Sequence, residues 1–323
     1  MDEYGLVESM WVNIRIRRLT SRLVHPPFLK HAKVRSSSLI ASMPMTFLTM
    51  LMYLGTALAE LLYKAAMIPP HARILDIGHG CGDSLLVLAK QYEPACLHGV
   101  TSVPTHARRA RERLGHRATV WCADVARWIR SDQATRSIYD VILALDCAYH
   151  FSDRAEFFRD AYARLALGGT LALVDLVSAW PYPVATDATA SKGTTASNLF
   201  HASTLPTPTR PPSAWHRIQH WCACYVSGSN PHAFVSFDKY KAMLLDAGFD
   251  YIEMQDISHD VFPGFSSFLL SIGVYDQVWR GGSAWQWRAL RAFGKVVQTW
   301  AKGGNAAYVR CGLIVARKTQ PHK

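Results

Sequence analysis

The sequence lacks an internal repeat, a cluster of metal-ligating residues and the three-part pattern of a secretion signal. Its seven cysteines are an odd number and several fall in predicted core strands, so we expect reduced thiols and no disulfide framework. Cys222 and Cys224 form a C-x-C pair with no second pair beside it, which is weak evidence for a metal site. These absences favour an intracellular chain, cytoplasmic or membrane-associated, that needs no metal.

Acidic residues are also few, since 24 Asp and Glu face 35 Lys and Arg and leave a formal net charge of +11. This excess favours anionic partners such as membrane surfaces, nucleic acid or acidic substrates. A second interpretation, which we prefer, assigns the charge to solubility and to a basic arm in residues 1–35, and we expect no DNA partner. The 323 residues allow one large domain or one and a half.

Residues 36–59 contain no charged side chain and are long enough to span a bilayer. Pro44, Gly55 and several Ser and Thr make such a span marginal, and apolar residues recur at helical spacing from Leu48 onward. We therefore predict one or two amphipathic helices that cap the pocket of the following domain and can touch a membrane surface through residues 1–67. A true membrane span is the less favoured alternative.

After Pro69 and Pro70, predicted strands and helices alternate, which is typical of an α/β fold with a mostly parallel sheet. The predicted strands are residues 72–77, 95–100, 118–122, 139–145, 170–174, 251–256 and 306–316. The predicted helices are residues 84–91, 104–114, 155–165, 214–226 and 237–247, with further helices within 265–303. Gly168 and Gly169 are expected to end the helix over 155–165.

Residues 185–213 interrupt the alternation with Ala, Thr, Ser and Pro, which predicts a long mobile loop or lid. The predicted organisation has four parts. Residues 1–69 form a basic arm and helical cap, 70–177 the ligand-binding core, 178–235 an inserted lid and acceptor region, and 236–323 the rest of the sheet with a helical insertion.

A glycine-rich turn follows the first predicted strand, because residues 76–82 read Asp-Ile-Gly-His-Gly-Cys-Gly. The glycines stand at every second position: Gly78, Gly80 and Gly82. Such a turn lets the backbone bend tightly and lets a ligand come close to it. Asp76 can accept hydrogen bonds from a cationic or hydroxylated ligand.

The residues after this turn indicate which ligand it does not suit. A dinucleotide fingerprint needs a third glycine at position 83, where this chain has an aspartate that would repel a pyrophosphate. A nicotinamide oxidoreductase is therefore disfavoured. Asp83 and Ser84 are instead expected to cap a helix that begins at Leu85. A turn that binds nothing is the alternative.

The spacing Asp-x-Gly-x-Gly-x-Gly resembles motif I of the class I (Rossmann-like) S-adenosylmethionine-dependent methyltransferases, and the resemblance covers about residues 70–177. It implies a Rossmann-like sheet of seven mostly parallel strands with helices on both faces. It also implies S-adenosyl-L-methionine as the cofactor, with the glycine turn beneath its methionine part. Asp76, Gly78, Gly80 and Gly82 are then cofactor-binding residues.

Residues 99–106 (Gly-Val-Thr-Ser-Val-Pro-Thr-His) resemble the Gly-Ile-Thr-x-Ser-Pro-x-Gln segment of sterol, tocopherol and cyclopropane-fatty-acid-synthase-like methyltransferases. Val103 replaces the serine and His106 the glutamine. The acid that grips the ribose in many family members is absent here. The resemblance makes Thr101, Ser102 and His106 candidates for ribose contacts, although His106 is equally well explained as a solvated residue at the start of a helix.

Two further segments resemble family signatures. Residues 121–125 (Trp-Cys-Ala-Asp-Val) match the adenine-binding signature, in which Asp124 accepts the adenine amino group and the N–H of Val125 donates. Asp124 can cap a helix at the same time. Residues 168–175 match the Gly-Gly turn and fifth strand, and Asp175 is expected to face the acceptor.

Residues 143–151 follow the fourth predicted strand, where family members border both cofactor and acceptor. Tyr149 and His150 are the catalytic candidates, since a neutral imidazole can remove a proton from a hydroxyl near pH 7. A helix-capping or core histidine is an equally good account of His150. Asp146 is a cofactor-binding candidate with the same ambiguity.

The resemblance implies methyl transfer to a small, apolar, lipid-like or secondary-metabolite acceptor, bound by residues 1–69, 178–235 and 260–305, which are rich in Trp, Tyr, Phe and Met. The alternatives are a non-catalytic cofactor- or membrane-binding protein on the same fold and an RNA methyltransferase. A nucleic-acid amino-methyltransferase is less favoured, because no Asn/Asp-Pro-Pro-Tyr segment follows residues 139–145.

Overall fold

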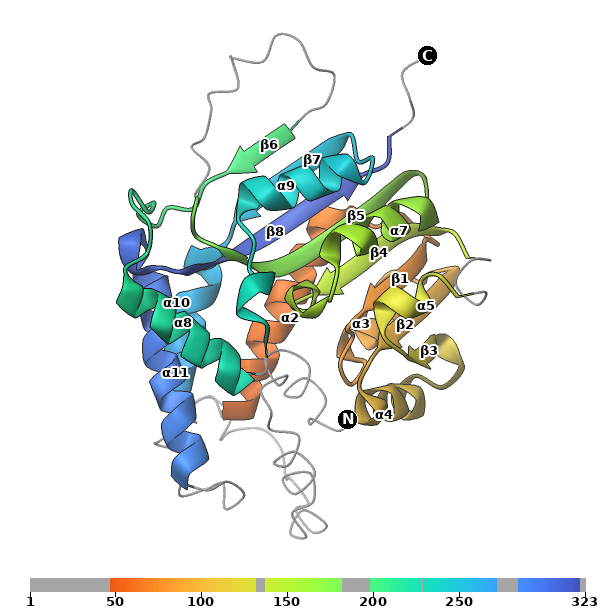
Figure 1. The fold of residues 1–323 in the computed structure, drawn as a ribbon. Coiled ribbons are helices and arrows are strands. Elements are labelled where there is room, and N and C mark those ends of the chain that lie inside the picture. The colour runs from red at the N-terminus through yellow and green to blue at the C-terminus, as the bar shows by residue number, and fades with distance from the viewer. Residues whose placement is uncertain (1–46, 132–136, 182–197, 228, 272–283, 320–323) are drawn as a thin grey trace, which may run out of the picture.

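An eight-stranded sheet organises the chain in a computed structural model, which describes residues 47–131, 137–181, 198–227, 229–271 and 284–319 (Figure 1). The strand order is β3-β2-β1-β4-β5-β8-β7-β6. The strands are β1 (Arg73–Ile77), β2 (Cys96–Thr101), β3 (Thr119–Cys122), β4 (Tyr139–Leu145), β5 (Leu165–Ser178), β6 (Asn198–His201), β7 (Tyr251–Asp256) and β8 (Val309–Arg317). Only β8 runs antiparallel to its neighbours, β5 and β7, so the α/β fold with a mostly parallel sheet is confirmed.

The sheet has one strand more than the seven predicted. The eighth, β6, lies within residues 185–213, which were expected to form a loop, and it pairs in parallel with β7 at the edge of the sheet. Its sequence Asn-Leu-Phe-His is too short for a clear alternating pattern. The prediction of a loop is therefore wrong for residues 198–201, and residues 182–197 lie outside the described part.

Helices cover both faces of the sheet, each with its own apolar core. One core includes residues of α2 (Phe47–Ala66), α3 (Asp83–Gln91), α4 (Pro104–Leu114), α10 (Ser258–Ser271) and α11 (Ala284–Lys302). The other includes residues of α5 (Val125–Trp128), α7 (Arg154–Arg164) and α9 (Phe237–Asp246), of which Figure 1 shows α7 and α9 in front of the sheet. Neighbouring residues of β1 alternate between the cores, with Ile74 in the first and Leu75 in the second.

Helix α2 begins at Phe47 and packs its buried side chains Leu58, Leu62 and Ala66 into the first core. The predicted amphipathic helix is therefore present, but it contacts β4, β5 and β8 on a sheet face. Residues 36–46 of the uncharged run lie outside the described part. Within that part, no helix combines the length and the apolar character needed to cross a bilayer.

The end of α7 and the start of β5 differ from the prediction. Helix α7 ends at Arg164, and Leu165 already pairs with Tyr139 of β4. The next paired residues are Val141 and Thr170, so Gly168 and Gly169 lie in an irregular stretch of β5. The prediction that they end the helix is wrong; Gly168, with φ of 80°, instead donates its N–H to the carbonyl of Lys318 at 2.6 Å.

The remaining described elements are one further helix and four short turns, of which η5 contributes His150 to the pocket described below. Helix α8 (Ala214–Ser227) follows β6, and short 3-10 turns occur at η4 (Gly115–Arg117), η5 (Ala148–His150), η6 (Pro231–Ala233) and η8 (Gly304–Ala306). The four-part division of the chain stays a prediction, although β6, β7 and β8 show that one sheet runs through the last three parts.

Candidate functional site

A pocket opens at the carboxyl ends of β1, β2 and β4, beside the point where strand order reverses between β1 and β4. The pocket and its open mouth together enclose about 690 Å³, part of which is open solvent. The lining contains these residues predicted from the sequence: Gly78, Gly80, Thr101, Ser102, His106, Asp124, Val125, Asp146 and His150. The fold thus brings together residues that lie as far apart in the sequence as Gly78 and His150.

Asp76 does not line the pocket; it lies directly behind the glycine turn and is only 2% exposed. The hydroxyl of Ser84 in the first turn of α3 donates to its carboxylate at 2.5 Å. Burial raises the pKa of Asp76 to about 7, against the opposing effect of the Ser84 hydrogen bond. Asp76 therefore joins the end of β1 to the start of α3.

The start of α3 also differs from the prediction, in which Asp83 and Ser84 cap a helix from Leu85. The residue before the helix is Gly82, with φ of 90°, and no side chain caps it. Asp83 is the first helical residue and forms an ion pair with Arg113 of α4 at 2.5 Å. Neither Asp83 nor Ser84 caps the helix N–H groups, because Asp83 pairs with Arg113 and Ser84 is hydrogen bonded to Asp76.

Gly78 and Gly82 are required by close packing. A Cβ atom on Gly78 would lie 2.7 Å from the Cβ and Sγ of Cys147, and one on Gly82 would lie 2.9 Å from the Cβ of Ala110. Gly80 lines the pocket and has φ of 55°, a conformation that favours glycine. Only Gly78 and Gly80 therefore form the pocket surface, while Gly82 allows α4 to approach the turn.

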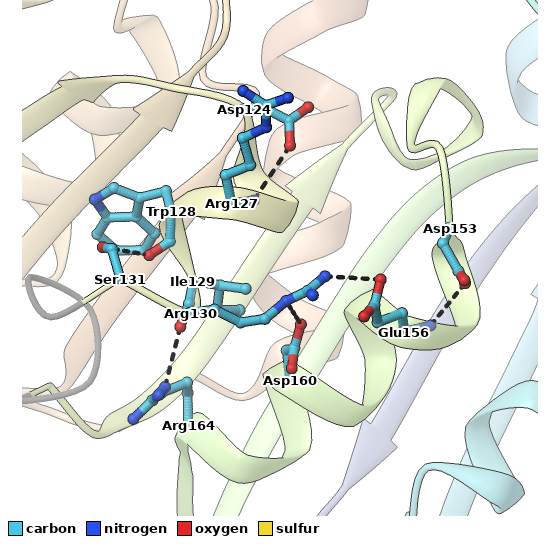
Figure 2. A network of polar contacts seen from close by, with 10 residues as sticks. All are labelled: Asp124, Arg127, Trp128, Ile129, Arg130, Ser131, Asp153, Glu156, Asp160 and Arg164. Carbon is cyan, nitrogen blue, oxygen red and sulfur yellow. Dashed lines mark hydrogen bonds and ion pairs between the residues drawn. The ribbon is translucent and has the colours of Figure 1, made fainter.

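The wall formed by α5 is capped and anchored (Figure 2). The side chain of Asp124 accepts the N–H of Arg127 at 3.3 Å, so the predicted helix cap is confirmed. Arg130, just after α5, pairs with Glu156 at 2.7 Å and Asp160 at 2.9 Å, both on α7. These contacts hold the wall that contains Asp124 and Val125 against the body of the domain.

The charge of the lining selects among ligands. Among the described residues that line the pocket there are two carboxylates, Asp124 and Asp146, and neither lysine nor arginine. The carboxylate of Asp124 favours a cationic ligand over a pyrophosphate, whereas the raised pKa of Asp146 favours its neutral form. Asp83, which the sequence analysis expected to repel a pyrophosphate, does not line the pocket and is paired with Arg113, so that argument against a dinucleotide stays a prediction.

Asp146 is in a strained conformation at the end of β4, with φ of 53°. Burial, together with the nearby charge of Asp175, raises its pKa well above the usual range, and its carboxylate is hydrogen bonded to the hydroxyl of Tyr149. Tyr149 is buried and does not line the pocket, so it fixes the Asp146 side chain from behind.

His150 lines the pocket at the end of η5, and its ring contacts that of Tyr149 in a tilted arrangement, with 4.2 Å between ring centroids. Burial lowers its pKa to about 4, so the ring is neutral at pH 7. Its Nε2 atom is buried and has no hydrogen-bond partner within the described part of the protein. A neutral ring with an unused nitrogen in a pocket can accept a hydrogen bond or a proton.

A buried network behind η5 was not predicted as a unit. Asp175, 0% exposed, accepts the N–H of Tyr149 at 3.0 Å and the hydroxyl of Tyr240 at 3.1 Å, and pairs with Arg154 at 3.3 Å. Arg154 also donates to the carbonyl of Ala148 at 3.3 Å. The prediction that Asp175 faces the acceptor is therefore wrong. Asp175 is buried and instead holds the turn that presents His150.

The sequence carries one signal for this network. Arg154 stands at the first position of α7, where a positive charge is unfavourable for the helix dipole. A buried carboxylate partner explains its presence there. The lining also contains apolar residues that sequence reasoning did not single out, notably Cys147 and Phe151, which flank the two catalytic candidates.

Comparison with known proteins gives one family match, to the "Methyltransferase domain" family over residues 74–169. The chain is 30% identical to erythromycin 3''-O-methyltransferase of Saccharopolyspora erythraea over 121 residues, which are 37% of this chain and 40% of the relative. It is 32% identical to trans-aconitate 2-methyltransferase of Variovorax paradoxus over 115 residues, 36% of this chain and 42% of the relative. The chain thus spans about two fifths of the length of these relatives.

A tocopherol O-methyltransferase of Arabidopsis thaliana is 27% identical over 107 residues, 32% of this chain and 29% of the relative. Among solved structures, phosphoethanolamine N-methyltransferase 2 of Haemonchus contortus matches with a TM-score of 0.61 at 15% identity, over 82% of this chain and 53% of that one. A cyclopropane synthase of Mycobacterium tuberculosis matches with a TM-score of 0.56 at 15% identity, over 81% and 84%. At these identities the structures show a shared fold.

Proposed function

Because residues 74–169 form a domain of the class I (Rossmann-like) S-adenosylmethionine-dependent methyltransferases, we propose that this chain transfers a methyl group from S-adenosyl-L-methionine to a small, apolar acceptor. The observation that supports this most strongly is the pocket itself. It combines a glycine turn, two hydroxyl side chains and two carboxylates with no lysine or arginine among its described residues. That donor set fits a ligand with a sulfonium and an ammonium group.

Each part of the lining has a role in this proposal. Gly78 and Gly80 leave room beneath the methionine part of the cofactor, and Thr101 and Ser102 offer hydroxyls to the ribose. Asp124 accepts the adenine amino group through the oxygen that does not cap α5. The N–H of Val125, the first residue of α5, has no partner within its helix and is placed to donate.

Asp76 and Gly82 act one layer behind the cofactor. Asp76 holds Ser84, and Gly82 lets α4 pack against the turn, so both keep the shape of the loop from residue 78 to residue 82. Asp146 is the carboxylate nearest to the post-strand turn, and Tyr149 fixes its orientation. The cofactor-binding role of each of these residues is part of the proposal.

When bound, the cofactor supplies a methyl carbon that its sulfonium has already activated. The chain must orient the acceptor, exclude water and take up a proton where the attacking atom carries one. His150 is placed to accept that proton at Nε2. Its pKa of about 4 makes it a weak base, but the proton of a hydroxyl becomes strongly acidic as the oxygen acquires the methyl group.

The acceptor class is inferred from two sources. The side chains next to His150 are aromatic: Phe151 lines the pocket, and Phe234 stacks on Tyr149 with 5.6 Å between centroids. The names of the relatives specify small acceptors such as erythromycin and tocopherol. An apolar small molecule fits this part of the site better than a nucleic acid does.

A transfer assay with methyl-labelled cofactor tests the proposal. The purified chain is incubated with organic-solvent extracts of lipids and secondary metabolites, with total RNA, or with buffer alone. We expect label in solvent-extractable products. Label confined to RNA would establish the RNA alternative, and binding of S-adenosylhomocysteine without transfer to any acceptor would favour a non-catalytic cofactor-binding protein.

A further inference from the structure

Helix α8 has a buried side that fixes it to the rest of the fold. His220 and Cys224, one turn apart, are both buried, and the ring of His220 stacks on Tyr308 with 4.2 Å between centroids. The same ring meets Phe234 edge-on at 4.7 Å. This side of the helix is therefore fully used in packing.

The opposite side of α8 is apolar and open to solvent. Trp215, Ile218 and Trp221 are 63%, 53% and 52% exposed, and their spacing of three residues keeps them near one another along the helix. We call these three residues the α8 face. They are three of the eight large hydrophobic residues that are exposed among the side chains whose burial the structure describes, and they include both tryptophans of that set. An apolar group of this kind indicates an interaction surface.

The chain around the α8 face is basic and contains no acid. Residues 188–237 include no Asp or Glu, and Arg217 is exposed between Trp215 and Ile218. A second acid-free stretch, residues 277–323, contains helix α11 with its exposed basic side chains. The two stretches meet where the side-chain oxygen of Asn305 accepts the N–H of Thr209 at 2.8 Å.

This combination identifies the partner by its chemistry. Tryptophan side chains have an apolar body and a polar N–H and prefer the interface between lipid and water. Each exposed Lys or Arg near an anionic bilayer adds about 1 kcal/mol of attraction. A surface with two exposed tryptophans and the exposed Arg217, in a stretch of chain without acid, fits an anionic phospholipid bilayer.

The buried side of α8, opposite the α8 face, is linked to the pocket by a series of ring contacts. The rings of Tyr308, His220, Phe234 and Tyr149 follow one another in contact, and Tyr149 contacts the tilted ring of His150 in the pocket lining. We propose that the α8 face docks this protein on an anionic phospholipid bilayer, next to the opening through which an apolar acceptor enters. The docking itself is inferred from the exposed residues of α8, whereas the entry of an apolar acceptor beside it rests on the proposed function.

Vesicle sedimentation of the full chain tests the docking without any activity measurement. Vesicles of phosphatidylcholine with phosphatidylserine are compared with vesicles of phosphatidylcholine alone, at low and high salt. The double variant Trp215→Ser/Trp221→Ser is compared with Met67→Ser/Leu245→Ser, which removes exposed apolar side chains from α9 and from the residue after α2. Thermal unfolding checks that both variants are folded.

We expect the wild-type protein to bind the anionic vesicles more tightly than the neutral ones, and less so at high salt. The tryptophan variant should lose at least ~10-fold in partitioning, and the control variant should stay within about 2-fold. Equal binding by all proteins, or no vesicle binding, would overturn the proposal. So would a tryptophan-dependent self-association in sedimentation velocity, or tryptophan-dependent binding to RNA in place of vesicles. Arg217→Gln should weaken the preference for anionic vesicles.

Discussion

Arg154→Met tests whether the buried network behind η5 holds the turn that presents His150. The guanidinium of Arg154 is nearly inaccessible, lies 3.3 Å from Asp175 and sits 5.0 Å from the centre of the Tyr240 ring. Methionine can fill much of the same volume without the charge. The substitution leaves the Asp175 carboxylate buried with neutral donors, namely the Tyr240 hydroxyl and the N–H groups of Tyr149 and Leu176.

Removing one partner of a buried ion pair typically costs about 3–5 kcal/mol of unfolding free energy. Burial already raises the pKa of Asp175, and Arg154 is the strongest opposing influence, so the variant raises it further. A carboxyl group whose pKa is raised in the folded state destabilises the fold as pH rises above its unfolded pKa, near ~3.9. The loss in Arg154→Met should therefore be larger at pH 8 than at pH 5.

The assay is urea unfolding at both pH values for four proteins: wild type, Arg154→Met, Asp175→Asn and the double variant. The double variant removes both charges, so we expect it to be more stable than the sum of the single losses predicts. Glu112→Gln is the control, because its pair with Arg108 is exposed on α4 and should contribute at most about 0.5 kcal/mol. A loss below about 1 kcal/mol in Arg154→Met, or equal losses at both pH values, would refute the reasoning.

Three further predictions concern the pocket. His150→Ala should lower turnover by ~10²-fold or more while cofactor affinity is retained, which labelled-methyl transfer and calorimetry measure separately; an unchanged rate would make His150 structural. In the wild-type protein we expect stability to fall as pH rises from about 4 through the raised Asp76 pKa of about 7, and Asp76→Asn should remove most of that fall. Asp76→Ala should abolish cofactor binding. Wild-type behaviour in both variants would show that Asp76 is not part of the site. Asp124→Ala should cost about 1 kcal/mol through the lost α5 cap and also weaken cofactor binding, whereas Arg127→Ala, which keeps the cap, should leave binding intact.

The sequence was sufficient for the parts of the fold in which local patterns and tertiary structure agree. The strands from β1 to β4 and the helices α4 and α9 match their predicted ranges within one or two residues, since each has strong apolar periodicity and clear end signals. The carboxyl ends of adjacent parallel strands share an edge of the sheet, and this brings most of the predicted site residues into one pocket. They are Gly78, Gly80, Thr101, Ser102, Asp124, Val125, Asp146 and His150.

The failures arise where a long-range contact decides the local structure. Asp83 and Ser84 have capping side chains, but Arg113 and Asp76 bind them more strongly than the helix N–H groups do. Gly168 and Gly169 resemble a helix stop, yet the pairing of Leu165 with Tyr139 ends α7 at Arg164, four residues before Gly168 and one before the predicted end of the helix. Strand β6 exists only because the edge of β7 offers it a partner. The role of Asp175 depends on Arg154 and Tyr240, which no local pattern connects to it.

The central claim is that the pocket between β1, β2 and β4 binds S-adenosylmethionine. Calorimetric titration of the purified protein with S-adenosylmethionine, S-adenosylhomocysteine and, as a control, an oxidised nicotinamide dinucleotide tests it most directly. The account predicts micromolar binding of the first two and no binding of the dinucleotide, because the lining contains Asp124 and no lysine or arginine among its described residues to hold a pyrophosphate. Absence of binding by both sulfur compounds, or binding of the dinucleotide alone, would contradict it.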